Sequence, residues 1–129
     1  MKKKKQIMLE DLVPSLALCK QIPHGEFWNS ALCWRTFNKG RRDEYTIVFP
    51  TGTIDPHDDD ISAPTCQEIL EDLRTFTNNP TLWGRPTGWC ADCDVSMTSE
   101  WDVREKESKD NPANALLELW FEVKGIEVQ

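Results

Sequence analysis

The clearest pattern of apolar and polar positions lies near the end of the chain, between Asn111 and Gly125. Asn111 is a good helix N-cap, Pro112 suits the first helical position, and glycine typically follows the last helical residue. A polar stripe recurs every fourth residue: Asn114, Glu118 and Glu122. Apolar residues cover most of the remaining surface: Ala113, Leu116, Leu117, Trp120, Phe121 and Val123. The pattern predicts a helix whose wide apolar arc packs on a large surface, for which a sheet is the natural candidate.

A second amphipathic helix is predicted to begin after Thr65. Thr65 stands three residues before Glu68, which is the spacing of a capping box. The apolar residues that follow recur with helical period: Cys66, Ile69, Leu70, Leu73 and Phe76. The run Asn78-Asn79-Pro80 should end this helix. A shorter helix is predicted from Pro14-Ser15 to before Pro23, because proline and glycine stop it there. Its core residues are Leu16, Ala17, Leu18 and Cys19.

Short apolar and alternating segments predict the strands. Segments 30–37 and 45–49 are β-prone, and the turn-like segment 38–44 joins them, so we expect an antiparallel hairpin. Segment 50–60 is rich in proline, glycine and acidic residues and is predicted to be a loop. The alternation between residues 81 and 107 is weaker, but apolar residues still alternate with polar ones: Val95 and Met97, then Trp101 and Val103. Two or three more strands are expected there.

This order of elements indicates an α+β fold. We expect a mostly antiparallel sheet of four to five strands with about three helices packed on one side. Residues 1–8, which include four consecutive lysines, are predicted to be a basic, flexible N-terminal tail. Residues 9–129 are predicted to form a single α+β domain, because 129 residues suit one core and no repeat is visible.

Composition and charge narrow the classes of function. The net charge is −7, and without Lys2 to Lys5 the remainder carries −11, so nucleic acid is disfavoured as a partner. No apolar run approaches the roughly 18–20 residues of a membrane span, and no signal peptide is recognisable, so we expect the bacterial cytoplasm. A reducing cytosol predicts free thiols for the five cysteines, which are odd in number.

Four segments carry distinctive combinations of caps and core positions. They are Leu12-Val-Pro-Ser15-Leu-Ala-Leu-Cys19, Gly25-Glu-Phe27 with Ser30-Ala-Leu32-Cys-Trp34, Ala63-Pro-Thr65 with Glu68-Ile69, and Asn111-Pro-Ala113-Asn-Ala115-Leu-Leu-Glu-Leu-Trp120. Together they resemble a loosely defined family of small uncharacterised proteins from phages and prophages of gut-type bacteria. The resemblance spans most of the chain and implies a phage or prophage origin, but it carries no catalytic residue. The segment 85–94 is not part of it.

That segment contains the sharpest chemical feature, Cys90-Ala-Asp-Cys93. A two-residue spacing lets two sulfurs bind one Zn²⁺ or form a redox-active disulfide. A zinc site would need two more ligands from scattered residues such as Cys66, His57 or His24. We therefore predict ordinary thiols and no cofactor, and keep a zinc or redox protein built on Cys90 and Cys93 as an alternative.

Two features suggest a binding surface. The acidic run Asp58, Asp59 and Asp60 lacks the glycine and distal glutamate of an EF-hand, so it is a solvated turn or a docking site, and His57 beside it could respond to pH. Trp83 and Trp89 flank a turn-rich stretch that includes Arg85, and exposed tryptophan and arginine anchor many protein interfaces. The candidate partner-binding residues are Asp58, Asp59, Asp60, Trp83, Arg85 and Trp89.

No motif of an enzyme is complete. Cys19 and Cys33 lie near His24 in the sequence, but each sits in an apolar stretch where a buried thiol is inert. We expect a non-enzymatic phage or prophage protein that binds a host or phage macromolecule, in one version an acidic inhibitor of host defence. A structural or self-assembling phage component is a further alternative, and a homo-oligomer stays open.

Overall fold

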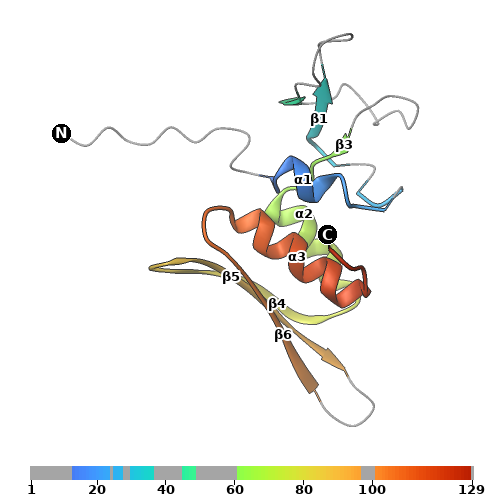
Figure 1. Cartoon of the computed structure of the whole chain (residues 1–129). Helices are drawn as coiled ribbons and strands as arrows, with labels where there is room; N and C mark the ends of the chain where they lie inside the picture. The colour runs from blue at the N-terminus through green and yellow to red at the C-terminus, as the bar shows by residue number, and fades with distance from the viewer. Residues whose placement is uncertain are drawn as a thin grey trace, which may run out of the picture.

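The computed structural model describes residues 13–23, 25–27, 30–36, 45–48, 61–96 and 101–128. The described residues form three helices and six strands (Figure 1). In chain order these are α1 (Leu16–Cys19), β1 (Cys33–Thr36), β2 (Tyr45–Val48), β3 (Ile61–Ser62), α2 (Cys66–Arg74), β4 (Asn78–Arg85), β5 (Gly88–Ser96), β6 (Trp101–Ser108) and α3 (Pro112–Lys124). The α+β class is confirmed. The predicted tail at 1–8 and the loop at 50–60 lie outside the described residues.

The strands belong to two sheets, which corrects the prediction of one sheet with four to five strands. β2, β1 and β3 form one antiparallel sheet, and β4, β5 and β6 form the other. Helices α2 and α3 lie between the β4–β5–β6 sheet and the part of the chain that contains α1 and β1 (Figure 1). Alternation along a strand indicates which residues share a face, but it does not say which strands pair on either side of an intervening helix. The two sheets therefore looked like one in the sequence.

The helix boundaries follow the predicted caps. The Thr65 hydroxyl accepts from the Glu68 amide while the Glu68 carboxylate accepts from the Thr65 amide, which completes the capping box of α2. The Asn111 side chain accepts from the amides of Ala113 and Asn114 at the start of α3. Gly125 ends α3 with φ of 74°, a conformation that glycine adopts without strain.

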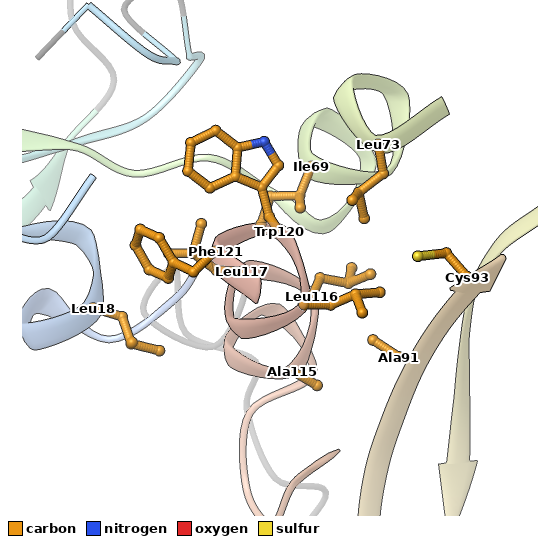
Figure 2. Close-up of a cluster of buried hydrophobic side chains, with 11 residues drawn as sticks. Leu18, Ile69, Leu73, Ala91, Cys93, Ala115, Leu116, Leu117, Trp120 and Phe121 are labelled. Carbon is orange, nitrogen blue, oxygen red and sulfur yellow. The ribbon is translucent and has the colours of Figure 1, made fainter. Parts of the chain in front are cut away.

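The larger core forms around α3 (Figure 2). Leu116, Leu117, Trp120 and Phe121 are fully buried and pack against α1, α2 and β5. The contributions of the other elements are Leu18 from α1, Ile69 and Leu73 from α2, and Ala91 and Cys93 from β5. The predicted apolar arc thus packs on a sheet on one side and on helices on the other. Burying each such large side chain contributes on the order of 1.5–3 kcal/mol.

A second hydrophobic core includes residues of the β2–β1–β3 sheet. Its buried members are Val13, Cys19, Leu32, Trp34, Ile47 and Ala63. Two asparagine side chains at the start of α3 hydrogen-bond to the segment that precedes α1, next to this core. The Asn111 amide group donates to the Val13 carbonyl at 2.9 Å, and the Asn114 side chain accepts from the Ser15 amide at 2.7 Å. Asn114 belongs to the predicted polar stripe, but its side chain binds the segment before α1. Ile22 packs against both cores.

Two apolar positions depart from the predicted pattern. Phe76 lies beyond the end of α2 and is 36% exposed, with the Lys124 ammonium over its ring. Val103 on β6 is 61% exposed, since its side of the sheet carries no described helix. Within the described residues α3 is the longest helix, with 13 residues, and none has the length and apolar character needed to span a bilayer.

Candidate functional site

The β4–β5–β6 sheet has two unlike faces. Helix α3 packs on β5 and β6, and α2 packs on β4, so one face is covered (Figure 1). The strand register places the following residues together on the opposite face: Thr81, Trp83, Arg85, Cys90, Asp92, Asp94, Val103, Glu105 and Glu107. We call this the open face, because no described helix or strand lies on it. It is the best candidate for a functional surface.

A polar network centred on Asp92 crosses the open face. The Trp83 indole N–H donates to Asp92 Oδ2 at 3.0 Å, and the Thr81 hydroxyl donates to Asp92 Oδ1. Thr81 is the register partner of Asp92, and Trp83 is two residues further along β4. These bonds join β4 to the central strand through side chains in addition to the backbone ladder. They hold the Asp92 carboxylate in one orientation.

Arg85 connects the opposite edges of the same face. Its guanidinium lies over the Trp83 ring, 4.4 Å from the centroid, and it donates to the carboxylates of Glu107 and, at 3.4 Å, of Glu105. All these side chains are substantially exposed, so each ion pair contributes little to stability, typically 0–1 kcal/mol. Their effect is to order an aromatic and charged surface. The open face carries four carboxylates, Asp92, Asp94, Glu105 and Glu107, of which Glu105 and Glu107 pair with this guanidinium.

The two tryptophans of the predicted turn are exposed, but they lie on opposite sides of the sheet. Trp83 is on the open face and is 40% exposed, whereas Trp89 pairs with Gly84 on the helix side and is 39% exposed. Trp89 borders a hollow of about 370 Å³ whose lining also includes Arg85, Glu107 and Lys109. The β4–β5 hairpin projects beyond the helices at this end (Figure 1). Both rings therefore flank the hairpin end, defined here as residues 83–89.

Cys90 and Cys93 do not come together. Three residues apart on an extended strand, they point to opposite faces, so Cys90 lies on the open face and Cys93 points into the core toward Leu116 (Figure 2). One ion or one disulfide cannot use both sulfurs without rearranging β5. The alternative of a zinc or redox pair built on Cys90 and Cys93 therefore has no support from the geometry.

The five cysteines are free thiols in the structure, and four show raised pKa values. Burial raises the pKa of Cys19 to about 12, with the neighbouring Trp34 indole opposing part of the effect. The pKa of Cys90 is raised to about 11, first by burial and then by the Glu105 carboxylate, against the influence of Arg85. Burial also raises the pKa of Cys66 and Cys93. Such thiols are poor nucleophiles near neutral pH.

Other predicted site residues lie outside the described part of the chain. These are Asp58, Asp59, Asp60, His57 and His24. A hollow of about 420 Å³ near α2 is lined partly by Glu26, Glu68, Glu71 and Asp72. Two of these carboxylates serve the fold, since Glu68 caps α2 and also accepts from the Ala31 amide, and Asp72 accepts from the Trp120 indole. We therefore favour the open face over this hollow.

Sequence reasoning missed Asp92 and Glu105. Asp92 stands two residues after Cys90, so an extended segment places both on one face, and this signal was present in the sequence. Glu105 required the pairing of β5 with β6, where it stands opposite Asp92. Comparison of the chain with protein-family models, with curated proteins and with solved structures found no match.

Proposed function

We propose that this chain is a phage- or prophage-encoded protein that acts without catalysis, by binding another protein through the hairpin end and the adjoining open face. The observation that carries the proposal is the pair of tryptophan rings, 40% and 39% exposed, on either side of one projecting hairpin. Tryptophan and arginine are enriched among the residues that dominate interface energies. Arg85 lies between the two rings in the sequence and is stacked on Trp83.

The charge of the open face favours a basic partner. The open face carries four carboxylates, Asp92, Asp94, Glu105 and Glu107, against the single guanidinium of Arg85, and the whole chain carries a net charge of −7. Complementary charge raises the rate of association and selects partners. In the finer form of the proposal, the partner is a host defence protein whose basic nucleic-acid site these carboxylates occupy. The competing outcome is self-association, which the experiment must distinguish from binding to a different protein.

The test compares capture by the native protein and by a Trp83→Ala/Trp89→Ala double variant. Each is immobilised and exposed to bacterial lysate at low and high salt, and retained proteins are identified by mass spectrometry. We expect one partner that the native protein retains, that the double variant loses, and that high salt releases, because exposed charges are screened within about 10 Å at 0.1 M salt. Direct affinity measurement with that purified partner should then show a loss of at least tenfold, the size expected when interface anchors are removed.

Phe76→Ala is the matched control, because Phe76 is also an exposed aromatic residue but follows α2. It should retain the partner at native affinity. Equal retention by the double variant, or retention that high salt leaves unchanged, would contradict the proposal. If the immobilised native protein captures only further copies of this chain and forms a stable oligomer, self-assembly would replace the proposed function.

A further inference from the structure

We propose that Cys90, Asp92 and Glu105 form a binding site for a zinc-type divalent cation on the open face. The Cys90 sulfur and one carboxylate oxygen from each of Asp92 and Glu105 all lie within 4.8 Å of one another. In the described part of the chain, this is the one group of three such side chains placed closely enough to share an ion. The site does not depend on the protein partner proposed above.

The strands bring the three groups together without any loop. Cys90 and Asp92 are alternate residues of the central strand β5, and Glu105 is the register partner of Asp92 on β6. Side chains on paired strands are held more rigidly than side chains on loops, which suits a coordination site. The backbone ladder therefore sets the spacing of the sulfur and the two carboxylates.

The site is closed on the protein side and open toward solvent. Cys90 has no exposed surface, although no described helix covers its face, and its direct strand neighbours on that face are Trp83 and Glu107. Asp92 is half-buried, and the Glu105 side chain is 45% exposed. Three protein ligands would leave a fourth tetrahedral position for water or another ligand.

The donor set selects the class of metal. Mg²⁺ and Ca²⁺ prefer sites made only of oxygen, whereas a thiolate with two carboxylates suits Zn²⁺, which accepts sulfur and oxygen. A cysteine thiolate and two carboxylates carry three negative charges, and a divalent cation would offset two of them. The positive charge of the ion would also stabilise the thiolate form of a cysteine that lies beside carboxylates.

Neighbouring side chains already orient the two carboxylates. Asp92 accepts from the Trp83 indole at 3.0 Å and from the Thr81 hydroxyl, and Glu105 accepts from Arg85 at 3.4 Å. Hydrogen bonds of this kind to metal-binding carboxylates commonly change metal affinity 10–100-fold. When Glu105 turns to the ion, Arg85 keeps its contact with Glu107. The ion can therefore enter without leaving this guanidinium unpaired.

Binding must displace the thiol proton. The S–H bond of Cys90 breaks, its proton leaves to the solvent, and the sulfur electron pair forms the bond to the metal. A cysteine thiol is ordinarily protonated at neutral pH. One proton should be released from this thiol for each ion, and affinity should rise with pH.

The test titrates the reduced, chelator-treated full chain with Zn²⁺ by calorimetry in two buffers of different ionisation enthalpy, and with Co²⁺ by absorption. We expect one ion for each chain, release of about one proton, and the near-ultraviolet charge-transfer absorption of a cobalt thiolate. Cys90→Ser should abolish that absorption. Asp92→Asn and Glu105→Gln, at more exposed positions, should each weaken Zn²⁺ binding at least about tenfold.

Asp102→Asn and Cys66→Ser are the matched controls, since they remove a β6 carboxylate on the other face of the sheet and a thiol outside the group. Both should keep the cobalt absorption and an affinity within about twofold of the native value, as expected when no ligand is lost. No Zn²⁺ binding by the native chain would overturn the proposal. So would a cobalt absorption that survives in Cys90→Ser, or equal weakening by Asp102→Asn and Glu105→Gln.

Discussion

Two tryptophans of this chain donate the same kind of hydrogen bond in different surroundings. The Trp120 indole donates to Asp72 at 2.6 Å and is fully buried, whereas the Trp83 indole donates to Asp92 at 3.0 Å and is 40% exposed. Water can replace a lost donor at the exposed site but not as readily at the buried one. The buried bond should therefore matter far more to stability.

Replacement of each tryptophan by phenylalanine tests this difference. Trp120→Phe removes the donor to a half-buried carboxylate and part of the core volume, so we expect the free energy of unfolding to fall by about 1–3 kcal/mol. Trp83→Phe should change it by no more than about 0.5 kcal/mol. Chemical denaturation of both variants measures the two values. Equal losses of unfolding free energy in the two variants would mean that burial of the indole does not decide how much its hydrogen bond contributes to stability.

For single residues, the sequence predicted which positions are buried in the core better than it predicted which residues they contact. Helical period correctly marked Leu116, Leu117 and Trp120 as core residues. The same period could not show that Asn114 binds the Ser15 amide, since that contact joins positions 99 residues apart. It also did not show that the Cys90 sulfur would meet Glu105, because that contact depends on strand register.

Among the elements, the β4–β5 hairpin depends on one glycine. A Cβ atom on Gly88 would lie 2.6 Å from the Ser108 carbonyl oxygen and 2.9 Å from the Lys109 Cα, and both atoms belong to the backbone. The φ angle of Gly88 is also positive, at 154°. A Cβ on Gly84 would meet only the Trp89 ring, at an ordinary 3.5 Å. These two positions on the same hairpin therefore make a matched pair.

We expect Gly88→Ala to destabilise the protein by about 1–3 kcal/mol, because the end of β6 must move away from β5. Gly84→Ala should leave stability unchanged or raise it by up to about 1 kcal/mol, since alanine loses less backbone entropy in a strand. Thermal unfolding of the two variants beside the native protein measures the difference. A Gly88→Ala variant as stable as the native protein would contradict the close packing of the β5–β6 junction.

The helices were predictable because their signals are local. The capping box of Thr65 and Glu68 and the pair Asn111 and Gly125 all act within a few residues of the helix that they bound. Strand pairing is not local, so the sequence predicted two or three strands between residues 81 and 107 without fixing the number. The structure has three, β4, β5 and β6. The exposure of Val103 shows the same limit, because alternation alone does not say which face a helix will cover.

For the whole molecule, the buried thiols predict a loss of stability in alkali. The ordinary pKa of a cysteine is 9.0, and burial raises that of Cys19 to about 12 in the folded protein. The folded state thus holds this proton more tightly than the unfolded state does. The resulting stabilisation is fully present below pH 9 and is lost as the pH rises from 9 toward 12, at about 1 kcal/mol for each pH unit.

Cys19→Ser isolates this contribution, because the hydroxyl does not titrate in that range. The variant should start from a lower free energy of unfolding at pH 8, and its stability should fall less steeply than that of the native protein between pH 9 and 11. The two proteins differ only at position 19, so the difference between the two curves belongs to Cys19. Parallel curves would show that Cys19 keeps an ordinary pKa after folding.

Helix α3 supplies most of the larger core and, through two asparagine side chains, the bonds to the segment that precedes α1. It is also the last of the described elements to leave the ribosome during synthesis. The nascent chain therefore exposes the apolar sides of α1, α2 and β5 until translation reaches residue 121 or beyond. Synthesis that stalls before that point should yield a chain that chaperones bind and proteases readily remove.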